Sequence, residues 1–184
     1  MENRKSGWEM LSNETKYENP WIRVEHHEVI TPTGQPGIYG KVHFKNVAVS
    51  VVPIDADGNT YLVGQERYTI GQYSWELPEG GCLIESDESP LDAAKRELME
   101  ETGLEAETWT CLGEVYLSNS VTDEKAVIFL AKNLKQHMAQ PEETEVLQIR
   151  KLPLQDAIEM AKNGEISDAL SVISLLKVPG FHFS

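Results

Sequence analysis

Cysteine, basic residues and long apolar runs are all scarce in this sequence. Cys82 and Cys111 are the only cysteines in 184 residues and form no CxxC pair, so neither a zinc site nor a disulfide framework is indicated. The 16 Lys and Arg face 30 Asp and Glu, for a formal net charge of −14, and without a basic tract nucleic acid is not an expected partner. The longest apolar runs, residues 47–54 and 126–131, are too short to cross a membrane, and the N-terminus lacks the apolar core of a signal peptide. We therefore expect a cytoplasmic protein with no membrane partner.

The chain has the size and composition of one globular domain. Its 40% hydrophobic and 25% charged residues exclude collagen-like, mucin-like and wholly disordered classes. Alternating apolar and polar residues bounded by turn residues predict strands, and the first two form an antiparallel hairpin around Thr31-Pro-Thr-Gly. The expected strands cover residues 21–30, 38–44, 47–54, 60–65, 73–76, 108–116 and 125–131.

Helices are expected among and after these strands. Ser89 followed by Pro90 is a typical helix start and Gly103 a typical stop, which predicts a helix between them. Further helices begin near Leu154 and cover Ser167 to Leu176. Strands with interspersed helices indicate an α+β fold class or an α/β/α sandwich.

The first helix carries three carboxylates on one face. Glu97, Glu100 and Glu101 are spaced i, i+3 and i+4 near the C-terminal end, where mutual repulsion and the helix dipole both disfavour them. Oxygen ligands at this spacing suit Mg²⁺ or Mn²⁺. Taken alone, however, such a cluster favours a solvated acidic face.

The residues before and within the helix favour metal chemistry. Glu76-Leu-Pro-Glu-Gly80-Gly81 is a loop whose glycines permit close backbone approach, and from Arg96 to Leu104 the chain reads Arg-Glu-Leu-Met-Glu-Glu-Thr-Gly-Leu. This resembles the signature of the Nudix hydrolases: Gly, five residues, Glu, seven residues, Arg-Glu-hydrophobic-x-Glu-Glu-x-Gly-hydrophobic. Seven residues separate Glu88 from Arg96, as in the signature, but six residues and not five separate it from Gly81. We expect a bulged loop with the site retained.

The resemblance implies a fold and a catalytic apparatus. Residues 45–184 would form a Nudix α/β/α sandwich with a mixed β-sheet, and residues 1–44 an N-terminal antiparallel β-extension for dimerisation and base binding. The metal, Mg²⁺ with Mn²⁺ as the alternative, would be held by Glu97, Glu100, Glu101, Gly81 and Glu145. The catalytic residues would be Glu97, Glu101, Arg96 paired with Glu88, and Glu143 as the base. A flexible acidic linker is the alternative interpretation of the segment that contains Glu143 and Glu145.

Nearly the whole chain is similar to the ADP-ribose and nucleotide-sugar pyrophosphatase branch of the family. By that resemblance the substrate-binding residues are Trp21 and Tyr39, which sandwich the base across a dimer, Arg67, which binds the pyrophosphate, and Glu124. The alternatives are core or dimer contacts for the two aromatics and a surface ion pair for Arg67. Trp8, Trp75 and Trp109 are assigned to the core. Asn119 stands where ADP-ribose pyrophosphatases carry a proline, which favours a GDP-sugar or relaxed use of several nucleotide sugars.

The implied reaction is Mg²⁺-dependent hydrolysis of the pyrophosphate bond of a nucleoside diphosphate sugar, of the ADP-ribose or GDP-mannose type, to a nucleoside monophosphate and a sugar phosphate. The branch also implies a homodimer. Two alternatives stay open. One is a Nudix hydrolase acting on another nucleotide, such as a dinucleoside polyphosphate or a coenzyme derivative, and the other is a non-catalytic nucleotide-sugar sensor.

Overall fold

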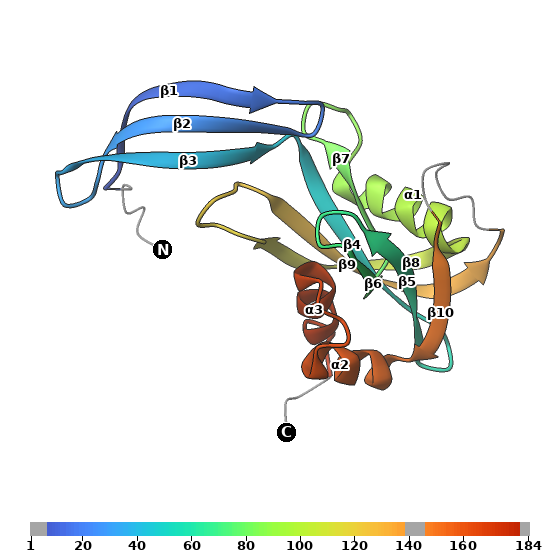
Figure 1. The fold of residues 1–184 in the computed structure, drawn as a ribbon. Coiled ribbons are helices and arrows are strands. Elements are labelled where there is room, and N and C mark those ends of the chain that lie inside the picture. Colours follow the sequence, from blue (N-terminus) through green and yellow to red (C-terminus); the bar gives the residue numbers. More distant parts are fainter. Residues whose placement is uncertain (1–6, 139–145, 181–184) are drawn as a thin grey trace. The chain divides into compact units, whose positions relative to one another are not determined.

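The computed structural model describes residues 7–138 and 146–180 (Figure 1). The chain divides into two compact units. The first consists of the N-terminal residues through Asn46 together with Ser118–Glu124, and the second consists of Val47–Leu117 and the residues from Lys125 onward. The chain therefore leaves the second unit once, contributes Ser118–Glu124 to the first, and returns.

The first unit is built on an antiparallel sheet of strand order β1-β2-β3. Its strands are β1 (Glu9–Glu18), β2 (Ile22–Ile30) and β3 (Pro36–Phe44). The predicted hairpin is confirmed, since β2 and β3 pair along their whole length around a turn in which Gly34 has a φ of +81°. The sequence did not predict β1, because every one of its residues is exposed and it lacks the alternation of a half-buried strand.

The segment Ser118–Glu124 is fastened to β3 through Asp123. Its carboxylate oxygens lie 2.7 Å from Lys41 Nζ, 2.7 Å from His43 Nδ1 and 3.0 Å from Phe44 N. Partial burial raises the pKa of Asp123, but the hydrogen bonds from these three groups outweigh it and bring the pKa to about 2. A charged Asp123 thus holds the segment in the first unit.

The described strands of the second unit form two sheets. A mixed sheet has the order β7 (Glu79–Leu83), β4 (Asn46–Ile54), β9 (Lys125–Gln136), β8 (Leu104–Tyr116), and an antiparallel sheet has the order β10 (Gln148–Pro153), β5 (Asn59–Arg67), β6 (Gln72–Glu76). β4 and β9 run parallel, whereas β8 and β9 are antiparallel. The predicted mixed β-sheet is therefore confirmed.

The helices lie on both faces of the mixed sheet. They are α1 (Pro90–Thr102), α2 (Leu154–Asn163) and α3 (Ala169–Leu176). Val51 packs in an apolar cluster with Leu98 of α1, whereas its neighbour Val52 packs in another with Ile158 of α2 and Leu175 of α3. Successive strand residues face opposite sides of a sheet, so α1 covers one side and the C-terminal helices the other. This is the α/β/α sandwich that the sequence predicted.

Helix α1 begins and ends where the sequence predicts. Ser89 Oγ accepts a hydrogen bond from Asp92 N–H, and Gly103 ends the helix with a φ of +70°. No helix in the described ranges is long and apolar enough to cross a membrane.

Candidate active site

Arg96 forms hydrogen bonds with three of the carboxylates at the candidate site. Its Nε donates to Glu88 Oε1 over 3.0 Å, its Nη1 to Glu97 Oε1 over 2.8 Å and Glu100 Oε2 over 3.0 Å, and its Nη2 to the Gly81 carbonyl over 3.0 Å. The bond with Glu88 raises the pKa of Arg96 still further above its ordinary value. One permanently charged fork therefore ties the loop after β7 to the acidic face of α1.

Glu97 is packed against the glycines of β7. A Cβ atom on Gly80 would lie 2.0 Å from Glu97 Cδ, so only glycine leaves space for this carboxylate. Gly81 N–H donates to Glu97 Oε1 over 3.2 Å. Burial raises the pKa of Glu97, although Arg96 and the Gly81 N–H act in the opposite direction. The result is a half-buried carboxylate in a glycine-lined cradle.

Glu101 comes from the same helix and is more deeply buried, with 5% of its surface exposed. Its Oε2 accepts a hydrogen bond from Glu79 N–H over 3.1 Å. The backbone of β7 thus holds two carboxylates of α1, Glu101 through Glu79 and Glu97 through Gly81. The spacing i, i+4 on the helix is what allows one strand to reach both.

The donor set fits a hard divalent cation. Carboxylate oxygens are the ligands that Mg²⁺ prefers in proteins, and a Cβ atom on Gly80 would fill the cradle that holds Glu97. In residues 7–138 and 146–180 no three acidic, histidine or cysteine side chains converge on one point, and Glu97 and Glu100 bond Arg96 instead. The predicted base Glu143 and the predicted ligand Glu145 lie outside the described residues.

The extra residue between Gly81 and Glu88 lies in an exposed turn after β7. Ser86 closes this turn, because its N–H and its Oγ both donate to the Leu83 carbonyl, over 3.1 and 2.8 Å. The loop therefore absorbs the longer spacing locally, and Glu88 still reaches Arg96.

Arg67, the predicted pyrophosphate ligand, ends β5 beside β6. Its guanidinium forms a bidentate ion pair with Glu76, with Nε 2.9 Å from Oε1 and Nη2 in contact with Oε2. The Glu76 carboxylate is buried, whereas the Arg67 side chain is 41% exposed. The bond to Glu76 raises the pKa of Arg67. The structure thus places Arg67 in a fixed, partly exposed ion pair, and its phosphate contact stays a prediction.

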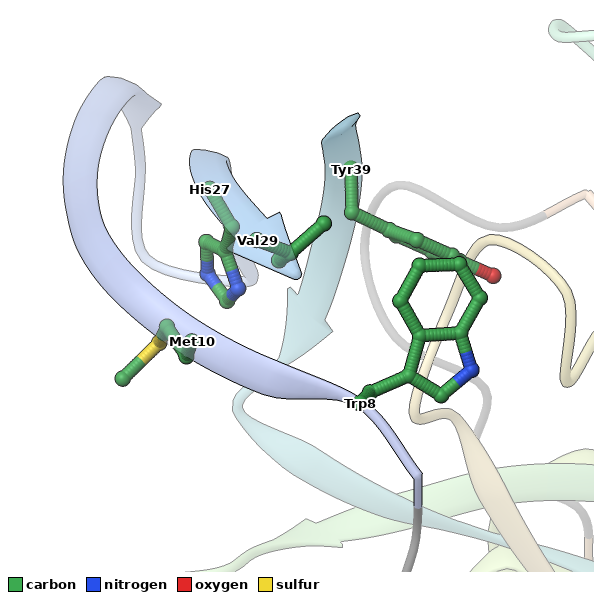
Figure 2. A pocket seen from close by; sticks show the side chains of 5 residues that line it. All are labelled: Trp8, Met10, His27, Val29 and Tyr39. Atoms are coloured by element: carbon green, nitrogen blue, oxygen red, sulfur yellow. The ribbon is translucent and has the colours of Figure 1, made fainter. Parts of the chain in front are cut away.

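The first unit contains a hollow of about 300 Å³ lined by Trp8, Met10, His27, Val29 and Tyr39 (Figure 2). The rings of Trp8 and Tyr39 meet edge to face with centroids 5.5 Å apart, and Tyr39 Oη donates to the Ser120 carbonyl over 2.6 Å. The assignment of Trp8 to the core was wrong. This side chain is 46% exposed, because it precedes a strand that is exposed throughout.

The two aromatics predicted to bind the base lie far apart in one chain. Trp21 immediately precedes β2 and is 67% exposed, whereas Tyr39 pairs with His27 on β2. A separation of six strand residues corresponds to about 20 Å. A sandwich of one base between Trp21 and Tyr39 within a single chain is therefore excluded, and their joint action across a dimer stays a prediction.

A second hollow of about 180 Å³ adjoins Tyr39 and contains polar groups from the segment Ser118–Glu124. It is lined by His27, Tyr39, Lys41, Asn119, Ser120, Val121 and Thr122. Among the described residues, His27 Nε2 is buried without a hydrogen bond and lies 3.5 Å from a Glu25 oxygen. Glu124, the predicted substrate contact, is half-buried, and its N–H donates to Thr122 Oγ1 over 3.3 Å.

Sequence reasoning missed His27 and Trp8 as residues of these hollows. The position of His27 opposite Tyr39 in the hairpin was the available signal, because it follows from the turn at Thr31.

Comparison with known proteins places the chain in a family. Residues 44–172 match the NUDIX domain, and residues 8–42 match the nucleoside diphosphate sugar hydrolase N-terminal domain. The first match covers more than half of the chain and includes α1 with its carboxylates. The chain therefore belongs to the Nudix family, and it is a Nudix hydrolase.

Similar proteins match most of the chain. It is 32% identical over 177 residues to an ADP-ribose pyrophosphatase of Mycobacterium tuberculosis, covering 93% of this chain and 83% of that protein. It is 31% identical over 132 residues to a GDP-mannose pyrophosphatase of Yersinia pestis, covering 68% and 66%. The crystal structure of an ADP compounds hydrolase is similar with a TM-score of 0.81 and 26% identity, over 92% of this chain and 91% of the other. The chain thus shares the α+β Nudix fold with that hydrolase.

Proposed function

We propose that this Nudix hydrolase splits the pyrophosphate bond of a nucleoside diphosphate sugar into a nucleoside monophosphate and a sugar phosphate, with Mg²⁺ or Mn²⁺ as its cofactor. The observation that carries the proposal is the pair of carboxylates, Glu97 and Glu101, held by backbone N–H groups of β7. The relatives named ADP-ribose pyrophosphatase and GDP-mannose pyrophosphatase support the substrate class.

The residues of α1 would divide the work between metal binding and positioning. Glu97, Glu100 and Glu101, with the Gly81 carbonyl, would hold the cation, which supplies charge stabilisation to the phosphates and an activated water. Arg96 would keep Glu88 and the loop against α1. Arg67 would bind the pyrophosphate with the part of its planar, charged fork that is exposed. Glu143 remains the proposed base and Glu145 a further ligand.

The first unit would supply base recognition and dimerisation, as proposed for residues 1–44, with 45–184 as the hydrolase domain. The aromatic hollow at Tyr39 supports a base contact, since flat rings accept a base by stacking. Exposed apolar side chains support a homodimer, because association would remove them from water; they include Trp8, Met10, Leu11, Tyr17, Trp21 and Ile38. In such a dimer the partner's Trp21 would complete the site of Tyr39. Glu124 would contact the substrate, and the cytoplasm is the proposed location.

ADP-ribose and GDP-mannose are the proposed substrates. Asn119 lines a hollow beside Tyr39. This position supports a role of the segment Ser118–Glu124 in deciding which nucleotide sugar is preferred. A second candidate function is hydrolysis of other ADP compounds, which the similarity to an ADP compounds hydrolase supports.

The test is chromatographic product analysis of the full chain with ADP-ribose and GDP-mannose in parallel, with Mg²⁺ and with EDTA. We expect AMP or GMP together with a sugar phosphate, dependent on Mg²⁺ and lost in Glu101→Gln. Lys95→Ala is the matched control on the same helix, because Lys95 contacts Asp92 and is 48% exposed. Absence of turnover of both substrates, or turnover that EDTA leaves unchanged, would overturn the proposal.

A further inference from the structure

A single buried hydroxyl joins helix α3 to the loop before β7. Ser171 is completely buried. Its Oγ accepts a hydrogen bond from Leu77 N–H over 2.9 Å and donates to Glu79 Oε1 over 2.7 Å. Ser171 itself is fixed at the start of α3, since its N–H donates to Asp168 Oδ2 over 2.7 Å. Both ends of the segment Leu77–Glu79 are therefore bonded to one atom of a distant helix.

The same segment carries the N–H that holds Glu101. Glu79 uses its carboxylate toward Ser171 and its backbone N–H toward Glu101 Oε2. Between the two anchored residues, the Pro78 carbonyl accepts a hydrogen bond from Val51 N–H of β4 over 2.9 Å, and the fixed φ of proline restricts the backbone further. A shift of this segment would move the donor away from Glu101.

We propose that Ser171 and Glu79 are positioning residues that hold the Glu101 carboxylate in place for the divalent cation. The inference rests on the proposed function for the identity of the metal site and adds the route by which α3 fixes one ligand. Hydrogen-bond partners behind a ligand orient it, and their loss typically weakens metal affinity by about 10- to 100-fold. Without the Ser171 hydroxyl, Leu77 N–H and the Glu79 carboxylate each lose a buried partner, which favours rearrangement of the segment.

Ser174 on the same helix provides a control that separates a positioning role of Ser171 from a purely structural one. Ser174 is also completely buried, and its Oγ lies 3.1 Å from Ser50 Oγ. Ser50 in turn hydrogen-bonds to Glu79, so Ser174 stands one bond further from the segment. Ser174→Ala removes a buried hydroxyl of α3 and leaves both bonds of Ser171 intact.

The test measures the affinity of the full chain for Mn²⁺ in the absence of nucleotide. The concentration of free Mn²⁺ is monitored by electron paramagnetic resonance, and thermal unfolding checks that each variant is folded. We expect Ser171→Ala and Glu79→Leu to weaken Mn²⁺ binding about tenfold or more. Glu79→Gln keeps an acceptor oxygen for Ser171 and is expected to stay within about twofold of the wild type, as is Ser174→Ala.

Equal Mn²⁺ affinities of Ser171→Ala and Ser174→Ala in folded protein would overturn the inference, as would a wild-type chain that does not bind Mn²⁺. Hydrolysis is measured separately. A wild-type chain that binds Mn²⁺ and splits no nucleotide sugar would overturn the proposed function, while the comparison of the serine variants would still decide the positioning role.

Discussion

Gly80 and Glu97 are packed so closely that a Cβ atom on the glycine would lie 2.0 Å from the Glu97 Cδ atom. The atoms displaced by such a methyl group are the end of a flexible side chain, so the protein can accommodate it by moving the carboxylate. The contact therefore controls the position of Glu97, a proposed metal ligand, more than it controls the stability of the fold.

Gly80→Ala is expected to lower kcat/KM for nucleotide-sugar hydrolysis about 10- to 100-fold, because it moves Glu97 out of its cradle. Thermal unfolding should change little. Gly40→Ala is the control for the added methyl group, since a Cβ there meets no atom within 4 Å. Wild-type kinetics of Gly80→Ala would contradict the role given to this contact.

Arg96→Lys is expected to reduce hydrolysis by about tenfold or more, since an ammonium cannot reproduce the fork that bonds Glu88, Glu97, Glu100 and the Gly81 carbonyl. The melting temperature should fall as well, because one ammonium group cannot reach all of these acceptors at once and some carboxylates lose their hydrogen-bond donor. Steady-state kinetics and calorimetry measure the two effects. The neighbouring variant Lys95→Ala should leave both unchanged, and equal behaviour of the two variants would exclude a special role for Arg96.

Tyr39→Ala is expected to raise KM for a nucleotide sugar about tenfold, which corresponds to loss of one stacking contact of about 1–3 kcal/mol. Tyr39→Phe keeps the ring and removes only the hydrogen bond to Ser120, so its KM should remain near the wild-type value. Kinetics with ADP-ribose and GDP-mannose provide the measurement. If both variants behave alike, the hydroxyl and not the ring is the contribution of Tyr39.

Asp123 makes the stability of the first unit depend on pH. Its pKa in the folded protein is about 2, below the ordinary value of 3.8, so the stabilisation is complete above pH of about 4 and is lost as the pH falls toward 2. Asp123→Asn should therefore lower the melting temperature at neutral pH by roughly 2–4 °C, for about 1 kcal/mol after solvent screening. Melting curves from pH 6 to pH 2 should show the difference between variant and wild type shrinking in that window. A constant difference would show that charge plays no part.

Local signals decided which elements were predictable. Both ends of helix α1 were predictable from the sequence, because the residues that start and stop it lie next to it in the chain. Ser89 and Pro90 begin the helix, and Gly103 ends it. The missed strands lack a local signal: β1 is exposed on both faces, β7 reads Glu-Gly-Gly-Cys-Leu, with two poor strand formers, and β10 is exposed at every residue except Leu152. Their strand conformation comes from partners elsewhere in the chain.

The residues of the candidate site also divide into those that a local sequence pattern indicates and those that it does not. The spacing of Glu97, Glu100 and Glu101 is visible in the sequence, and with it the acidic face of α1. The contact of Ser171 with Leu77 spans 94 positions, and no pattern near either residue indicates it. The ring contact of Tyr39 with Trp8 also depends on how a strand without alternation lies beside β2, so no local pattern indicates it.

The path of the chain through Ser118–Glu124 sets an order on folding. The β2–β3 hairpin can form from neighbouring residues, but its bonds to Asp123 close a loop of about 80 residues, and long loops close slowly. During synthesis the N-terminal sheet must therefore wait, unfastened, until β8 has been made. The first unit is therefore complete only after residues 118–124 have been made, and a chain cut after β3 would leave the N-terminal sheet without the segment that secures it.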